Sequence, residues 1–179
     1  MRTENLFATP IFVRCYSDSN DLNDNIWKDL NSVPHVNDVF EVPGDGVSTL
    51  KERIMMDVNT IAKTYNWQNK PQTVKGRFNS IKPGGSDTPH THGAYLVGVY
   101  YLSVPKHSGD ILLHDPRGYI SWPELNFTPN DPLNRTSRCY HRVKPVEGML
   151  ILFPGFLAHS VETNLSNQNR VSIVFNVYN

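Results

Sequence analysis

The chain has 179 residues with 17 basic and 17 acidic side chains, so its formal net charge at pH 7 is +0. A chain of this length usually forms one domain, and balanced charge excludes a global field that would favour nucleic acid or an anionic membrane. Hydrophobic residues make up 39%, enough for a packed core, and 13 prolines with 11 glycines favour a β-rich fold over a helical bundle.

The first third of the chain is predicted to contain a strand and a helix. Alternating apolar side chains over residues 6–16 indicate a strand, and Pro10 favours an edge position in a sheet. Apolar residues at four-residue spacing predict a short amphipathic helix over residues 20–33. A loop containing Gly and Pro is expected at 42–47.

A second helix has the stronger pattern. Thr49 and Glu52 have the spacing of a capping box, and the helix is expected to end near Asn66. Its apolar residues recur on one face that needs a sheet or another helix to cover it: Leu50, Ile54, Val58, Ile61 and Tyr65.

Helical periodicity ends at Val74, after which short β-type runs alternate with turn residues. The predicted strands are 74–82, 94–104, 109–114, 148–153 and 170–178. A long polar excursion at 115–147 is either a binding loop or an insertion without a role. We therefore expect one domain over 1–179, with supporting elements in 1–73 and a β-sandwich or barrel in 74–179.

The two cysteines, Cys15 and Cys139, belong to no Cys-x-x-Cys pair, so neither a disulfide scaffold nor a structural zinc site is expected. The start of the sequence lacks a signal-peptide pattern, and no apolar run approaches about 18 residues. These features predict a protein of the reducing cytoplasm with no membrane partner.

Histidine is concentrated in the second half of the chain, which holds six of the seven residues. His90 and His92 are two positions apart, and in extended backbone such side chains point to one side, where both can face one metal ion. His159 follows a predicted strand and a Pro-Gly turn, so a barrel could supply it as a third ligand. The alternative is that all three are solvated or buried structural histidines. The others are expected in loops or at strand ends: His107, His114 and His141.

The last predicted strand has two different faces. One is wholly apolar, whereas the other carries Arg170, Ser172 and Asn176 beside Val174. A central strand turns polar side chains inward only where they line a pocket. Arg170 would then be a buried cation that needs an anion, and its planar fork suits a carboxylate. The alternative is a salt bridge from an edge strand.

Taken together, a His-x-His pair, a later His and an Arg-x-Ser pair resemble the 2-oxoglutarate- and Fe(II)-dependent oxygenases of bacteria and phages. That family is built on a double-stranded β-helix, a jelly-roll or cupin-like fold, here with two or more helices packed outside. The matching stretches are LFATPIFV, RFNSIKPGG, HTHGAYLVGVYYLSVP, SGDILLHDPR, EGMLILFPGFLAH and RVSIVFN.

The resemblance implies a metal site made of His90 and His159. The wider superfamily has Asp or Glu at the third position, where this chain has His92. Either His92 coordinates the metal, or it forms a hydrogen bond nearby and water takes its place. Asp115 is the reserve carboxylate if the three-histidine set fails.

The resemblance also implies a pocket for the co-substrate. Arg170 would hold the distal carboxylate of 2-oxoglutarate, with Ser172 as a second donor. Asn79 and Tyr101 are candidates for further polar contacts, although a turn-capping Asn and a core Tyr are equally good interpretations. Aromatic side chains that could border a substrate pocket are Tyr95, Tyr119, Trp122 and Phe156.

The implied reaction is the oxidative decarboxylation of 2-oxoglutarate to succinate and CO₂, coupled to hydroxylation of a C–H bond, with ascorbate as a supporting reductant. The substrate, small or macromolecular, is not identified by any motif, and a homodimer is left open. Nucleic acid is disfavoured, because the basic residues around 117–144 lack interleaved aromatics. The expected location is the cytoplasm of a bacterium or an infected host cell.

Two functions are alternatives to this oxygenase. One is a cupin-like three-histidine dioxygenase or isomerase that does not use 2-oxoglutarate. The other is a structural or binding domain without enzymatic activity.

Overall fold

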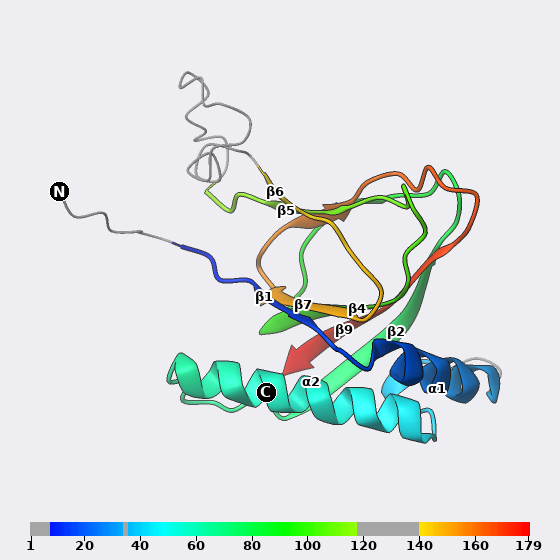
Figure 1. Ribbon diagram of the computed structural model, residues 1–179. Helices are drawn as coiled ribbons and strands as arrows, with labels where there is room; N and C mark the ends of the chain where they lie inside the picture. Colours follow the sequence, from blue (N-terminus) through cyan, green and yellow to red (C-terminus); the bar gives the residue numbers. More distant parts are fainter. Residues whose placement is uncertain (1–7, 34–35, 118–139) are drawn as a thin grey trace, which may run out of the picture.

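The computed structural model describes residues 8–33, 36–117 and 140–179, and the strands in this part of the chain form two antiparallel sheets (Figure 1). The large sheet consists, in spatial order, of Phe12–Cys15 (β1), Met149–Pro154 (β7), Leu96–Ser103 (β4), Arg170–Tyr178 (β9) and Thr73–Ile81 (β2). The small sheet consists, in spatial order, of Asp87–His90 (β3), His159–Val161 (β8), Ile111–His114 (β5) and Tyr140–Val143 (β6).

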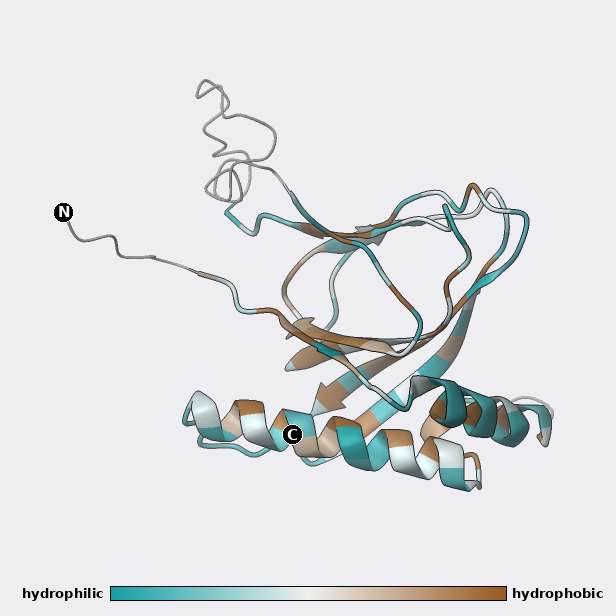
Figure 2. Cartoon of the chain, viewed as in Figure 1, coloured by the Kyte–Doolittle hydropathy of each residue, from teal (hydrophilic) through white to brown (hydrophobic). Residues whose placement is uncertain are grey.

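The two faces of the large sheet pack against different layers. Two helices, Ser19–Asn31 (α1) and Asp45–Thr64 (α2), lie below this sheet in Figure 1, while the small sheet lies above it. In Figure 2 the strands of the large sheet are mostly hydrophobic, whereas the helices alternate hydrophobic and hydrophilic residues. The arrangement is a β-sandwich with helices on its outside, which agrees with the sequence prediction.

Strand β9 shows how alternation produces two cores. The side chains of one face join the helix-side core: Val171, Ile173, Phe175 and Val177. Those of the other face point between the sheets, where Val174 packs against the second core and Arg170 and Ser172 are buried. The strand lies between β4 and β2, so both of its edges are paired in the sheet. The predicted division of this strand into an apolar and a polar face is confirmed.

Helix α2 covers the sheet with most of the predicted stripe. Leu50, Ile54, Val58 and Ile61 are buried, but Tyr65, which follows the helix, is 49% exposed. The predicted start is wrong, because the helix begins at Asp45 and not after Thr49. The predicted loop at 42–47 is correspondingly shorter, and a short 3₁₀-helix occupies Val39–Glu41.

The capping-box interpretation fails because another helix caps α2. The carboxylate of Asp29 in α1 accepts a hydrogen bond from the backbone N–H of Val47 at 2.9 Å. A Cβ at Gly46 would lie 2.4 Å from the backbone nitrogen of Ile26, so glycine allows α1 to approach this closely. Tertiary packing therefore decides where α2 begins.

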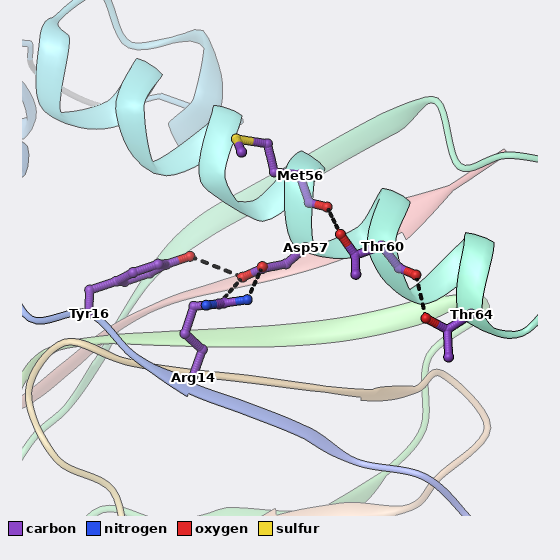
Figure 3. Close-up of polar contacts among 6 residues, drawn as sticks. All are labelled: Arg14, Tyr16, Met56, Asp57, Thr60 and Thr64. Atoms are coloured by element: carbon purple, nitrogen blue, oxygen red, sulfur yellow. Dashed lines mark hydrogen bonds and ion pairs between the residues drawn. The ribbon is translucent and has the colours of Figure 1, made fainter.

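Edge strand β1 is tied to α2 by polar contacts (Figure 3). The Arg14 guanidinium forms an ion pair with Asp57, with Nη2 2.7 Å from Oδ1, and the Tyr16 hydroxyl donates to the same carboxylate at 3.3 Å. The hydroxyls of Thr60 and Thr64 instead donate to carbonyls of their own helix. The edge position predicted from Pro10 agrees with the place of β1 at the end of the large sheet.

Six strands were expected; the five predicted from Val74 onward are found close to their predicted limits, but β3, β6 and β8 were not expected. Each of the three has only three or four residues, too few for a visible alternation. The strand predicted over 6–16 is shorter, and residues 1–7 lie outside the described part. Residues 118–139, most of the excursion predicted over 115–147, also lie outside the described part. Strand β6 lies in the remainder of that excursion. No helix in the described part is both long and apolar enough to span a membrane.

Candidate metal centre and anion pocket

Three histidines from different segments meet at one end of the two sheets. His90 ends β3 and faces His159 at the start of β8, since the two residues are partners in the β3–β8 register. His92 comes from the connection into β4. One ring nitrogen from each residue lies within 4.8 Å of the others, which is the only such group of potential metal ligands in the described ranges.

Each imidazole donates its Nδ1 hydrogen to an oxygen. The acceptors are the Thr88 carbonyl for His90 at 2.8 Å, the Asn176 side-chain oxygen for His92 at 2.6 Å, and the Leu157 carbonyl for His159 at 3.0 Å. Because carbonyl oxygens only accept, the hydrogen is on Nδ1 in all three rings. In a neutral ring with this tautomer Nε2 presents a lone pair, as in metal-binding histidines with an outer hydrogen bond.

Burial keeps two of the rings neutral. It lowers the pKa of His159 to about 4, and neighbouring imidazoles add to the effect. The same cause lowers the pKa of His92. His159 is 4% exposed and its ring centroid lies 4.8 Å from that of Phe153. Both rings are thus in the form that binds a metal at neutral pH.

The cluster contains no carboxylate. Asp115, the reserve ligand of the sequence prediction, forms an ion pair with Arg117 at 2.6 Å instead. His114, another histidine of this half, lies on β5 and shares a hydrogen bond with Ser160 at 2.8 Å. The potential donor set is therefore three imidazole nitrogens.

A buried cation lies on the face of β9 that also carries Asn176, and it has no ion-pair partner among the described residues. Arg170 is 2% exposed, and its Nε and Nη2 atoms are buried without any hydrogen-bond partner among the described residues. Its guanidinium carbon lies 5.0 Å from the centroid of the Tyr101 ring. A guanidinium removed from water in this way requires an anion, and its fork fits a carboxylate in two-point contact.

Polar groups next to Arg170 complete the pocket. Tyr101 is fully buried, and its hydroxyl has no partner among the described residues. Burial raises the pKa of Tyr101, which the Arg170 charge partly offsets, so the phenol stays a donor. Asn79 on β2 and Tyr101 on β4 both pair with Ser172 on β9, so the three residues form a row across the sheet.

The structure brings the three predicted histidines together, and it places Ser172, Asn79 and Tyr101 in one row beside Arg170. The sequence prediction did not identify Asn176 as the partner of His92, although its position on the polar face of β9 was a signal. Tyr95 and Phe156 line a cavity of about 770 Å³ that His92 also borders. Tyr119 and Trp122 lie outside the described residues.

The sequence matches the model of a known protein family. The family model described as "Putative 2OG-Fe(II) oxygenase" matches residues 78–176, which is more than half of the chain. The match begins in β2 and ends in β9, so it includes all three clustered histidines and Arg170. No curated protein is similar to the chain in sequence.

Solved structures resemble the chain in fold. A prolyl-4-hydroxylase from Pseudomonas putida matches with TM-score 0.60 and 14% identity, covering 95% of this chain and 88% of that one. HygX from Streptomyces hygroscopicus, solved with nickel, 2-oxoglutarate and hygromycin B, matches with TM-score 0.63 and 14% identity over 95% and 83%. The non-heme alpha-ketoglutarate-dependent carbocyclase SnoK from nogalamycin biosynthesis matches with TM-score 0.63 and 11% identity over 94% and 79%.

Proposed function

The chain belongs to the 2OG-Fe(II) oxygenase family, and on this premise we propose that His90, His92 and His159 hold its Fe(II) while Arg170 and Ser172 bind 2-oxoglutarate. The protein is a 2-oxoglutarate- and Fe(II)-dependent oxygenase; these residues are our assignment of its site. The observation that carries the assignment is that all three imidazoles use Nδ1 on protein oxygens and keep Nε2 free.

The donor set fits Fe(II), because imidazole is a common ligand of this ion and three ligands on one side leave positions for a co-substrate. When bound, Fe(II) and 2-oxoglutarate activate dioxygen for hydroxylation of a C–H bond, with 2-oxoglutarate converted to succinate and CO₂. Imidazole ligands carry no charge when they bind a metal, so Fe(II) would retain its double positive charge in this site, and a dianionic co-substrate would balance it.

Arg170 fits the other end of that co-substrate. Its Nε and Nη2 hydrogens have no acceptor among the described residues, so a carboxylate placed there would satisfy both. The Tyr101 hydroxyl has no partner either and would donate to the same group. Ser172 adds a buried hydroxyl from the same strand face, and Asn79 is the candidate for a further contact.

The test measures succinate formed from 2-oxoglutarate by protein supplied with Fe(II) and ascorbate, without added substrate. We expect the variants His159→Ala and Arg170→Ala each to lower this slow turnover more than about tenfold. Matched controls are His114→Ala and Arg142→Ala, which remove the same side chains outside the site and are expected to keep the turnover.

Two outcomes would contradict the assignment. If His159→Ala leaves stoichiometric metal binding and turnover intact, the three-histidine site is wrong. If metal binding requires the histidines but turnover is indifferent to Arg170, the metal site is of the three-histidine type and the proposed co-substrate pocket is wrong.

We also propose that the protein works in the cytoplasm, of a bacterium or an infected host cell, and on a substrate other than nucleic acid. Support comes from the zero net charge and from Cys15, which is exposed as a free thiol. Homodimer formation stays a prediction that gel filtration with light scattering can check.

A further inference from the structure

Two cations on β2 face the metal cluster from the neighbouring strand. Lys75 and Arg77 are exposed and alternate onto one face of β2, in register with Asn176 and Val174 of β9. Asn176 is the residue that accepts a hydrogen bond from His92. The pair therefore lies beside the outer partner of a proposed metal ligand.

A cavity of about 490 Å³ joins these cations to the cluster. It is lined by Lys75, Arg77, His90 and His92 among others, and no carboxylate contributes to its wall.

Neither cation has an ion-pair partner in the described part of the chain. Asp38 is the carboxylate next to this stretch of β2, and its Oδ1 accepts from the backbone N–H groups of Phe40 at 3.0 Å and Gly76 at 2.9 Å. Its position is therefore explained by backbone contacts. Two unpaired cations in a concave wall next to a reactive centre indicate recognition of an anion.

An aromatic cavity borders the other side of His92. Its volume is about 770 Å³, and its walls include Trp67, Tyr95 and Phe156. The rings of Trp67 and Tyr95 lie 6.3 Å apart between centroids. Tyr95 is 45% and Phe156 62% exposed, and exposed aromatics gathered at one cavity are typical of binding sites.

We propose that Lys75 and Arg77 form an anion subsite for the substrate, and that this oxygenase acts on molecules in which a phosphate or carboxylate is joined to an aromatic or apolar body. The anion binds the two cations and the apolar body enters the aromatic cavity. His92 borders both cavities, so the part of the substrate between the two groups lies nearest the metal. This inference rests on the proposed metal site.

The subsite differs from the pocket assigned to 2-oxoglutarate. Arg170 is buried between the sheets, whereas Lys75 and Arg77 are exposed at the edge strand of the large sheet. A co-substrate carboxylate satisfies the unpartnered atoms of Arg170 but leaves the β2 pair free. The two cations are therefore available for a second anion.

The experiment uses the full chain with Ni(II) in place of Fe(II), which binds without turnover, and calorimetry in two steps. The first step titrates 2-oxoglutarate and tests the proposed function. The second step, at saturating 2-oxoglutarate, titrates phenyl phosphate, phenylacetate, inorganic phosphate and benzyl alcohol. The variants are Lys75→Gln and Arg77→Gln, and the matched control is Lys82→Gln, an exposed cation just beyond β2 that lines neither cavity.

We expect phenyl phosphate or phenylacetate to bind, and each β2 variant to weaken that binding about tenfold, the loss of one charge-assisted hydrogen bond. Lys82→Gln should leave it unchanged, and benzyl alcohol should bind at least about tenfold more weakly than the anions. The tighter of the two anions identifies the group as phosphate or carboxylate.

Three results would overturn the inference while the proposed function stands: 2-oxoglutarate binds but neither aromatic anion does; the β2 variants weaken the anions no more than Lys82→Gln does; or Arg77→Gln weakens 2-oxoglutarate itself. If inorganic phosphate binds as tightly as phenyl phosphate, the aromatic cavity does not bind the apolar part of the substrate, and that part of the inference is refuted. Failure of 2-oxoglutarate to bind in the first step would refute the proposed function and, with it, the inference.

Discussion

Replacing Arg170 by Met is predicted to make the metal-free protein more stable while removing its response to 2-oxoglutarate. Two guanidinium donors, Nε and Nη2, are buried without partners in the described structure. Each unsatisfied buried donor costs about 1–3 kcal/mol, together about 2–6 kcal/mol. The guanidinium carbon of Arg170 lies 5.0 Å from the centroid of the Tyr101 ring. This cation–π contact stabilises the folded protein by about 1–2 kcal/mol and is lost in the Met variant. Met keeps an unbranched stem of similar reach, so packing changes little.

The net expectation is a gain of about 2 kcal/mol in the free energy of unfolding, or about 4–8 °C in Tm for a chain of this size. Urea and thermal denaturation of the metal-free protein measure it. In protein already saturated with Ni(II), 2-oxoglutarate at about 100 times Kd should stabilise the natural protein by a further ~2.7 kcal/mol and Arg170→Met not at all. Arg142→Met, at an exposed ion pair with Glu162, is the control and should change stability by less than about 1 kcal/mol. A variant that loses stability and still responds to 2-oxoglutarate would refute this account of Arg170.

Three further predictions address the metal cluster and the core. Asn176→Leu removes the acceptor of the His92 Nδ1 hydrogen and should weaken metal binding about 10–100-fold in a metal titration, with the circular dichroism spectrum unchanged. Burial lowers the pKa of His159 to about 4, so below about pH 6.5 the unfolded chain takes up a proton at this residue while the folded metal-free protein does not. The free energy of unfolding of the natural protein should therefore fall between pH 6.5 and pH 4 by about 3 kcal/mol more than that of His159→Gln. Parallel plots of this free energy against pH for the two proteins would contradict the prediction. In Gly98→Ala the new Cβ would lie 2.1 Å from Cζ of the buried Phe175 ring, so unfolding should need about 1–3 kcal/mol less free energy, whereas Gly93→Ala, with no atom within 4 Å, should show no comparable loss.

The sequence pattern predicts a β-sandwich or barrel with helices outside, the family resemblance implies a double-stranded β-helix, and both are confirmed. The prediction succeeds where one strand or helix carries its own pattern. The two faces of β9 and the apolar stripe of α2 depend only on alternation along one segment. The gathering of His90, His92 and His159 was expected from their order along β-type segments and agrees with the cluster observed.

The prediction fails where contact with a residue distant in sequence determines the local structure. The start of α2 depends on the carboxylate of Asp29 in α1, and propensity along α2 alone does not show it. Strands β3 and β8 exist because they pair with each other, His90 opposite His159. The place of Lys75 and Arg77 beside the cluster depends on the β2–β9 register, which no single strand encodes.

The three outer hydrogen bonds of the histidine cluster differ in how mutation can reach them. Those of His90 and His159 end on main-chain carbonyls two residues earlier, Thr88 and Leu157, which every amino acid supplies. That of His92 ends on the side chain of Asn176, 84 positions along the chain. Substitution of Thr88 or Leu157 therefore does not remove the acceptor of His90 or His159. The acceptor of the third imidazole can be changed by mutation. A substitution at position 176 would alter the basicity and orientation of His92, and so adjust the proposed metal centre, without replacing any of the three histidines.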